Sequence, residues 1–355
     1  MRVCNLDICT KLFLAPMAEV TDSSFRKICK EHGAGITFTQ MVSAEGILKN
    51  NFETLRHFSF SRTEKPIGVQ VLGNNPAILK EAANELSKMG ADLIDLNSGC
   101  PVDKVTSNKM GSALLDDPQI LGSLIKNLVD GSNGVPVSIK LRLGKNKSSI
   151  NIFETAKAAE DNGASLIFVH ARTREDKYET DADWSWLKKI KEKVNIPVVG
   201  NGSLFTPQHI KEMLALTGCD SAMVARGALG DPFIFSRYKL LLEKNSDPGL
   251  TDIKVVHDTI IKHIKFLQEE FGEVIALDKA KKHSIWYFKN YPEINSFLEK
   301  VFSAKNLDQL RELISVQVCN IQLNGKDFRE KDEIHKKFQK KVLFWLTDEN
   351  ENEFG

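Results

Sequence analysis

The sequence predicts an α/β fold, a (β/α)8 TIM barrel, followed by a smaller all-helical domain. Three observations support this fold class. Short apolar runs rich in β-branched residues recur through about the first 235 residues, and the stretches between them carry the 3.6-residue apolar spacing of helices. Beyond a turn-forming segment at 245–251, the apolar runs stop and only helical patterns continue.

Eight apolar runs predict eight strands, whose first residues lie 24 to 44 positions apart. Parallel strands covered on both faces are apolar throughout, and eight strand–helix units are the number that closes a barrel. A doubly wound sheet would also alternate strands and helices, but it usually has fewer strands and a G-x-G-x-x-G motif after the first, which this chain lacks. The predicted strands are 12–16, 36–39, 67–72, 93–97, 137–142, 166–170, 198–201 and 222–225.

The segments between the strands predict helices. Two of them, 76–90 and 151–163, end in the glycine that commonly terminates a helix. After the linker, helical patterns cover 253–271, 279–290 and 330–346. We therefore expect a barrel domain at 1–245, a helical domain at 246–346 and a disordered acidic tail at 347–355.

The composition is that of an ordinary soluble protein. Lys plus Arg (48) nearly balance Asp plus Glu (47), so the net charge of +1 does not by itself announce a nucleic-acid partner. No apolar run reaches the roughly 18 residues of a membrane span, and the first residues lack the pattern of a signal peptide. Six dilute cysteines without a C-x-x-C pair indicate a reducing compartment. We expect a cytoplasmic monomer with no membrane or metal partner.

Polar or conformationally special residues follow the predicted strands. Barrel enzymes place their active sites where the carboxyl ends of the strands meet. Some of these residues could be ordinary solvated loop starts, but the convergence of the whole set on one mouth favours a binding site. In chain order they are Pro16 and Met17, Gln40, Gln70, Asn97, Lys140, His170, Asn201 and Arg226.

Glycine-rich turns follow the last two predicted strands, at 200–202 and 225–227. Glycine lets backbone N–H groups approach an anion, and Arg226 adds positive charge. Because phosphate sites in barrels lie after strands seven and eight, these turns predict a phosphorylated ligand. A dinucleotide motif is a weak alternative, since Phe205 stands where its third glycine would be.

Three further side chains have both a structural and a chemical interpretation. Lys140 could hold an electron-rich ring or be an ordinary charged strand end, and His170 could contact a ligand or be a satisfied core histidine. Cys100 lies in the segment Asn-Ser-Gly-Cys-Pro, where core packing explains a thiol poorly. It could act as a nucleophile or as a proton donor, and the absence of an obvious partner base favours the proton donor.

Seven motifs, in order along the chain, resemble those of the tRNA-dihydrouridine synthases and cover nearly all of the predicted barrel. The element Asn97-x-Gly-Cys-Pro is highly specific, whereas the glycine motifs also occur in other FMN barrels. The segment KKHSIWY at 281–287 is similar to that family's C-terminal domain. The motifs are LAPMA at 14–18, QVLG at 70–73, DLNSGCP at 95–101, KLRLG at 140–144, HARTR at 170–174, GNG at 200–202 and ARGALG at 225–230.

The resemblance implies an FMN-dependent, NADPH-driven reduction of tRNA uridines to 5,6-dihydrouridine, with D-loop uridines as the expected targets. It implies that hydride from reduced FMN reaches carbon 6 of the uracil while Cys100 protonates carbon 5. The target base would have to leave its stack to reach the flavin. By matched position the flavin would be contacted by Pro16, Met17, Ala18, Gln70, Lys140 and His170, its phosphate held by Asn201, Gly202, Ser203, Ala225, Arg226 and Gly227, and the uracil oriented by Asn97.

The segment 279–289 is locally basic, with four lysines, His283 and no acidic residue, and with Trp286 and Tyr287 interleaved. Basic residues beside aromatics suit RNA phosphates and exposed bases. A solvated basic face whose aromatics lie in the core explains the pattern equally well. The RNA contacts expected from this pattern and from the resemblance are Arg174, Lys281, Lys282 and His283.

Other functions remain open at this point. An FMN barrel that reduces a free pyrimidine, like the dihydroorotate dehydrogenases, would keep the glycine and lysine positions but leaves the helical domain unexplained. A non-enzymatic RNA-binding protein descended from the barrel would not need Gln70, Asn97, Cys100 and Lys140. A dihydrouridine synthase that acts on another structured RNA is a further alternative.

Overall fold

The computed structural model describes residues 2–3, 6–7, 12–291 and 294–323. The chain divides into two compact units, one formed by 1–227 with 234–247 and the other by 228–233 with 248–355. The predicted helix at 330–346 and the predicted tail at 347–355 lie outside the described residues. Within the described ranges, no helix is long and apolar enough to cross a membrane, and the four cysteines form no disulfide.

A closed ring of eight parallel strands forms the first unit and confirms the predicted barrel. All eight predicted strands are present, each within two residues of its expected bounds. The pairing order is β4-β3-β11-β10-β9-β8-β7-β6, and β6 pairs with β4 to close the ring. The strands are β3 (Leu12–Leu14), β4 (Ile36–Phe38), β6 (Ile67–Leu72), β7 (Leu93–Ser98), β8 (Val137–Arg142), β9 (Leu166–His170), β10 (Val198–Asn201) and β11 (Ser221–Val224).

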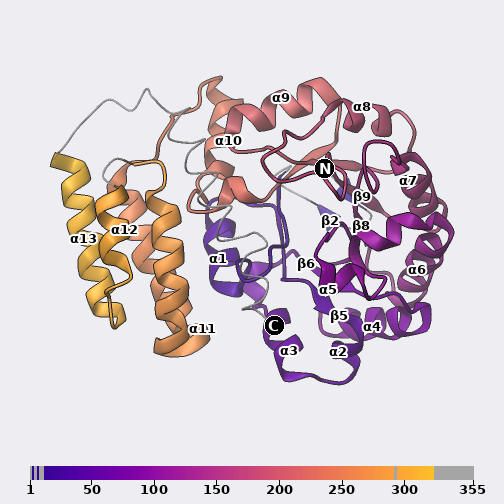
Figure 1. The fold of residues 1–355 in the computed structure, drawn as a ribbon, viewed down its shortest axis with the longest axis horizontal. Helices are drawn as coiled ribbons and strands as arrows, with labels where there is room; N and C mark the ends of the chain where they lie inside the picture. Colours follow the sequence, from indigo (N-terminus) through magenta and orange to yellow (C-terminus); the bar gives the residue numbers. More distant parts are fainter. Residues whose placement is uncertain (1, 4–5, 8–11, 292–293, 324–355) are drawn as a thin grey trace. The chain divides into compact units, whose positions relative to one another are not determined.

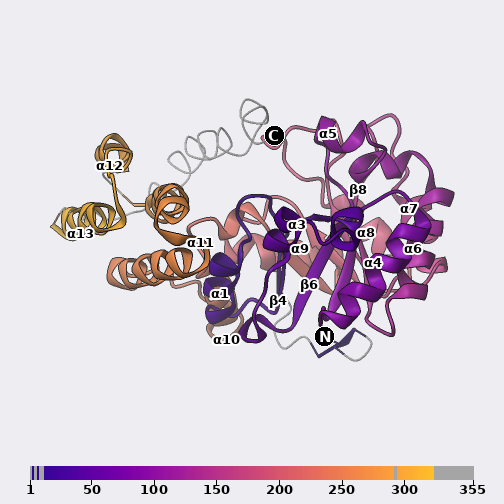
Figure 2. The ribbon, with the colours of Figure 1, turned by 90° about the horizontal axis from the view of Figure 1, so that it is seen from below.

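Two short features were not predicted: an extra strand on the barrel sheet and a separate two-stranded sheet. Strand β5 (Val42–Ser43) pairs with the carboxyl end of β6, and β1 (Arg2–Val3) pairs with β2 (Leu6–Asp7) as an antiparallel hairpin. Figure 2 shows this hairpin at one end of the barrel and helix α5 (Asp103–Thr106), which follows β7, at the opposite end. The mouth formed by the carboxyl ends of the strands is therefore the end that carries α5.

The barrel interior is apolar in its lower layers. Phe168 makes edge-to-face contacts with Phe13 and Phe38, at centroid distances of 5.1 and 5.4 Å. Residues Ile36, Leu93, Leu166, Val199 and Met223 complete this buried cluster. Because side chains alternate along a strand, residues two positions farther toward the carboxyl ends also face inward, and these include the polar residues of the mouth.

Helices surround the strands of the first unit, as Figure 1 shows for α1, α4, α6, α7, α8 and α9. Three of them begin at a proline whose preceding residue caps the helix: the side chains of Asn75, Asp117 and Thr206 accept backbone N–H groups. The helices are α1 (Ser23–Glu31), α2 (Ala44–Leu48), α3 (Phe52–Phe58), α4 (Pro76–Lys88), α5, α6 (Pro118–Gly131), α7 (Ile152–Asp161), α8 (Ser185–Lys191), α9 (Pro207–Thr217) and α10 (Ile234–Lys244), with 3-10 turns η1 (Arg62–Glu64), η2 (Gly111–Asp116) and η3 (Arg226–Ala228).

The second unit is helical in its described part. Helix α11 (Ile253–Phe288) is interrupted at Gly272, whose φ of 74° is left-handed. The rings of His263 and His283 lie 4.4 Å apart, whereas 20 residues of straight helix would separate them by about 30 Å. The chain therefore reverses at Gly272, and the two halves lie side by side, close to the predicted helices 253–271 and 279–290. Helices α12 (Ile294–Val301) and α13 (Leu307–Leu323) follow.

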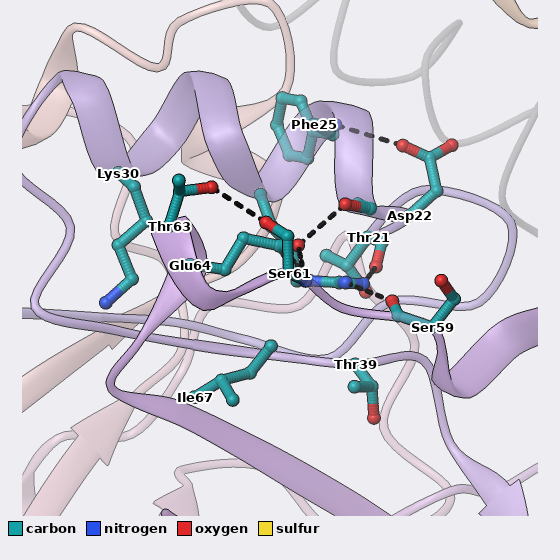
Figure 3. Close-up of polar contacts among 12 residues, drawn as sticks. Thr21, Asp22, Phe25, Lys30, Thr39, Ser59, Ser61, Thr63, Glu64 and Ile67 are labelled. Atoms are coloured by element: carbon teal, nitrogen blue, oxygen red, sulfur yellow. Dashed lines mark hydrogen bonds and ion pairs between the residues drawn. The ribbon is translucent and has the colours of Figure 1, made fainter. Parts of the chain in front are cut away.

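A buried ion pair joins α1 to η1 beside the loop that follows β3. The side chains of Arg26 and Glu64 are both 0% exposed, and Arg26 Nε donates to Glu64 Oε2 at 2.7 Å. The Arg26 guanidinium also donates to the carbonyls of Thr21 and Ser59, at 2.6 Å each. Glu64 Oε1 accepts from the backbone N–H of Ser61 at 2.7 Å, and Figure 3 shows Thr21, Ser59, Ser61 and Glu64 of this network together.

We expect Glu64→Ala to lower the free energy of unfolding by about 3–5 kcal/mol, because it leaves the Arg26 charge buried without its carboxylate. Urea denaturation measures the loss. Asp130→Ala is the control, since its ion pair with Lys126 is exposed and is worth at most about 1 kcal/mol. Equal small losses in both variants would contradict the structural role of the buried pair.

Candidate active site

The polar residues predicted at the strand ends form an inward-facing layer at the mouth of the barrel. The pairing register sets Gln70 beside Asp95, Asn97 beside Lys140, and His170 beside Asn201. Most of these side chains are buried, and Lys140 is half-buried. The structure therefore brings these residues together at one mouth, although Gln70 and Asn201 are separated by 131 positions in the sequence.

The loop that carries Cys100 is anchored at three points. Asn97 Oδ1 accepts the backbone N–H groups of Gly99 and Cys100, at 3.1 and 2.9 Å. Arg142 Nε donates to the Gly99 carbonyl at 2.7 Å, and the Ser112 N–H donates to the Cys100 carbonyl at 2.9 Å. These contacts hold the backbone on both sides of the half-buried Cys100 thiol.

A hydrogen-bonded chain lies below this loop. Ser138 Oγ and Gln70 Nε2 donate to the two oxygens of the buried Asp95 carboxylate, and Asn97 Nδ2 donates to Gln70 Oε1; each distance is 2.7 Å. Burial raises the pKa of Asp95 to about 6, against the opposing effects of these hydrogen bonds and of Lys140. Burial, followed by repulsion from Arg142, lowers the pKa of Lys140 to about 8.

The turns after β10 and β11 approach each other closely. A Cβ on Gly227 would lie 2.1 Å from the Leu204 carbonyl oxygen, so only glycine fits there. Gly202 and Ser203 have φ values of +121° and +56°, a left-handed pair in a turn that follows a strand. Ser203 Oγ accepts from the Ala182 N–H at 3.1 Å, which ties this turn to the loop after β9. We call the surface of these two turns, 200–203 and 225–227, the glycine cup; it is the place where the sequence predicts an anion.

Three arginines gather around this cup. Arg142 donates to carbonyls, Arg172 donates to the Thr180 carbonyl, to Ser203 Oγ and to the His170 ring, and Arg226 donates to the Tyr178 carbonyl. All these acceptors are neutral, and the negative charges that act on these arginines are those of Asp181 on Arg172 and Glu179 on Arg226. The Arg226 guanidinium also lies 4.9 Å from the Tyr178 ring centroid. This part of the mouth favours an anionic ligand.

The charge around His170 sets the protonation of its ring. Burial, then the positive charges of Arg142, Lys140, Arg172 and Arg226, lower the pKa of His170 well below its usual range, so the ring is neutral at pH 7. Arg172 Nη1 lies 2.8 Å from His170 Nε2 and can only donate. Nε2 is therefore the acceptor, and the proton of the ring is on Nδ1.

The segment 16–18 lies at the start of the loop after β3. The Met17 N–H donates to Thr21 Oγ1, whose hydroxyl donates back to the Met17 carbonyl, both at 3.0 Å. The Glu19 N–H donates to the buried Gln40 Oε1 at 2.7 Å. Because Arg26 holds the Thr21 carbonyl, the buried ion pair fixes this loop at the mouth.

The residues predicted to contact RNA are placed differently from one another. Arg174 lies in the loop after β9, where it pairs with Asp116 at 3.6 Å. Lys281 and Lys282 are half-buried on α11, but His283 is only 3% exposed and packs against His263. The structure does not place His283 on the surface with the two lysines, so a direct contact of its side chain with RNA is not supported.

The aromatic residues of the basic segment are buried, which agrees with the interpretation of this segment as a solvated basic face whose aromatics lie in the core. Trp286 and Tyr287 are each 1% exposed, so neither is available to stack on a base. Lys289 is also buried and donates to the Leu229 carbonyl. The surface lysines of this segment are therefore fewer than the sequence suggested.

Sequence reasoning did not assign roles to several residues of this site. Arg142 and Arg172 lie within the quoted motifs, and a charged residue inside an apolar run was the available signal for Arg142. Asp95, in the middle of a predicted strand, carried the same signal. Tyr178 lies in a polar loop, and nothing in the sequence connects it with the mouth.

Comparison with known proteins identifies the family. The sequence matches the model of the family described as "Dihydrouridine synthase (Dus)" over residues 13–322. The chain belongs to the dihydrouridine synthase family. It is 34% identical to tRNA-dihydrouridine synthase B of Vibrio vulnificus (strain CMCP6), over 86% of this chain and 94% of that protein. It is 33% identical to a probable tRNA-dihydrouridine synthase of Rickettsia conorii (strain ATCC VR-613 / Malish 7), over 84% and 90%. This dihydrouridine synthase is therefore an enzyme.

Solved structures show the same barrel fold at low sequence identity. A histamine dehydrogenase from Rhizobium sp. 4-9 matches this dihydrouridine synthase with a TM-score of 0.55 at 14% identity, over 75% of this chain and 50% of that one. A 2-naphthoyl-CoA reductase matches with a TM-score of 0.54 at 12% identity, over 69% and 51%. These likenesses support the fold and leave the chemistry to the residues of the site.

Proposed function

We propose that this dihydrouridine synthase reduces uridines of tRNA, foremost in the D-loop, to 5,6-dihydrouridine, with FMN as cofactor and NADPH as electron donor. The observation that carries the proposal is the juxtaposition, at one barrel mouth, of an anchored Cys100 loop and an arginine-surrounded glycine cup. The family membership and the names of its relatives support the same substrate.

The residues present fit a flavin mononucleotide. Its phosphate would lie against the turns Asn201–Ser203 and Ala225–Gly227, which pack closely because residue 227 is glycine, and the nearby arginines would supply positive charge. Asn201 is itself held by a 2.7 Å hydrogen bond from Nδ2 to the Met223 carbonyl. The ring system would lie against Pro16–Ala18, Gln70, Lys140 and His170. When bound, FMN supplies the hydride that uracil carbon 6 accepts.

The protein side chains have separate tasks in this proposal. Lys140 would present its ammonium, whose pKa burial lowers to about 8, to the electron-rich edge of a ring, and neutral His170 accepts from Arg172 without adding charge. Asn97 orients the uracil, and the Cys100 thiol gives its proton to carbon 5, leaving a thiolate near the Lys140 ammonium. Lys281, Lys282 and Arg174 contact the phosphate backbone of the RNA.

We expect the purified protein to be yellow and to release one FMN per chain on denaturation. Arg226→Glu should weaken FMN binding by about tenfold or more, because it places a negative charge beside the phosphate. Fluorescence titration of the apoprotein measures the affinity. Lys188→Glu, an exposed substitution on α8, is the charge-matched control. Release of FAD, or equal affinities in the two variants, would count against this cofactor site.

We expect Cys100→Ala to keep its flavin and to be reduced by NADPH at the parent rate, because entry of hydride into the flavin needs no thiol. Reoxidation by tRNA should slow by about 10²–10⁴, the usual effect of a positioned proton donor. Cys100→Ser should behave alike, since a hydroxyl is a far weaker acid. Stopped-flow absorbance measures both half-reactions. A reoxidation rate within a few-fold of the parent would make Cys100 a packing residue, and reoxidation by free uracil as fast as by tRNA would indicate a free pyrimidine substrate.

We expect the double variant Lys281→Glu/Lys282→Glu to bind tRNA about tenfold more weakly and to flatten its salt dependence, because fewer counterions are released. Filter binding at several salt concentrations gives the slope. Lys254→Glu/Lys300→Glu, two exposed lysines of the same unit, is the control. If both doubles bind tRNA alike, the lysines of α11 are an ordinary solvated face.

A further inference from the structure

We propose that Asp95 is a positioning residue for Cys100: its carboxylate, acting through the amides of Gln70 and Asn97, holds the backbone that carries the thiol. The inference rests on the proposed role of Cys100 and extends it to three residues on two neighbouring strands, β6 and β7. Each link between these residues depends on which atoms can donate and which can accept.

The Asp95 carboxylate sets the donor-to-acceptor direction of the hydrogen bonds that link Asp95, Gln70 and Asn97. An ionised carboxylate only accepts, so Gln70 must turn Nε2 toward Asp95, and the 2.7 Å contact is between these groups. Gln70 Oε1 then faces Asn97 and accepts from its Nδ2, again at 2.7 Å. Asn97 is left with Oδ1 toward the loop, where two backbone N–H groups need an acceptor. Each amide has one orientation that satisfies both neighbours.

Burial strengthens the hydrogen bonds that link these three residues. Asp95, Gln70 and Asn97 are 0, 2 and 6% exposed, so water cannot easily replace any one link. A hydrogen bond to a charged acceptor is roughly twice as strong as one between neutral groups, and successive bonds polarise one another. The charge on Asp95 therefore favours the Asn97 orientation that holds the Gly99 and Cys100 amides.

Among the groups that face one another around Asp95, Asp95 itself is the one whose protonation changes near pH 6. From β6 it meets Gln70, and from β8 it meets Ser138 and the Lys140 ammonium, with Arg142 and Cys100 next to Lys140. Gln70 and Ser138 do not titrate, and Lys140, with a pKa of about 8, stays protonated below pH 7. As the pH falls through about 6, Asp95 takes up a proton, and the charge that favours the orientation of Gln70 is lost.

Amide hydrogen exchange of the holoenzyme tests the proposal without relying on activity. Protection of the Gly99 and Cys100 N–H groups, relative to the unstructured peptide, should fall about fivefold or more in Asp95→Asn, which replaces a charged acceptor by a neutral one. Ser138→Ala is the matched control, since it removes the other hydrogen bond of the carboxylate but leaves the route to Cys100 intact. Its Gly99 and Cys100 amides should stay within twofold of the parent.

A rescue variant separates positioning from general disturbance. Gln70→Glu alone places two carboxylates together and should lose protection. The double variant Asp95→Asn/Gln70→Glu moves the charge one step along the chain: the new carboxylate accepts from the new amide and from Asn97, and every link is restored. Its protection should return to within threefold of the parent. The parent should also lose protection below pH 6, a step that Asp95→Asn should lack.

Protection in Asp95→Asn within twofold of the parent, or a double variant no better than Gln70→Glu, would overturn the proposal. Should Asp95→Asn fail to fold, the proposal is tested by comparing Gln70→Glu with the double variant Asp95→Asn/Gln70→Glu and by the pH series of the parent. A second readout, reoxidation of the reduced flavin by tRNA, should slow in Asp95→Asn while reduction by NADPH does not.

If the parent reduces no uridine yet the exchange results hold, the proposed function fails and the positioning stands. If the parent is active and the exchange is unchanged, the positioning fails and the proposed function stands.

Discussion

Closure of the parallel sheet is the constraint on which the site depends. Once β6 pairs with β4, the register of every strand is set, and residues two positions apart share the interior. Phe13, Phe38 and Phe168 fill the lower interior, so the next inward positions lie at the mouth. A shift of one residue in any strand would turn its polar end outward and put apolar side chains in its place.

Arginine side chains hold the loops of the mouth by donating hydrogen bonds to their backbone carbonyls. Arg26 fixes the loop after β3 through the Thr21 carbonyl, and Arg142 joins the Cys100 loop to the loop after β9 through the carbonyls of Gly99 and Thr173. A guanidinium presents its donors in a rigid fork, so it can hold several carbonyls at once in fixed directions. Three loops that are far apart in sequence are thus tied to one framework.

Charge is distributed unevenly over this mouth. The side of β9 to β11 carries Arg172 and Arg226 around the glycine cup, and His170 there stays neutral, so the positive charge remains available to an anion. The side of β6 to β8 holds Asp95 beside Lys140, with the Cys100 loop above them. One side suits the binding of a phosphate, and the other suits the control of a proton.

The sequence by itself determined the eight strands, the two-part organisation and the residues at the strand ends, because these depend on local apolar periodicity and on motifs. It also pointed to Cys100, since core packing explains a thiol in a polar, glycine-containing segment poorly. Only the tertiary structure decided which residues of α11 face water: Trp286, Tyr287 and His283 are buried, and the reversal at Gly272 brings His283 and Tyr287 against His263. It likewise decided that Asp95 meets Gln70 and that Asn97 holds the Cys100 loop. The contact between Asp95 and Gln70 depends on the pairing of β6 with β7, which joins residues 25 positions apart and leaves no trace in local sequence.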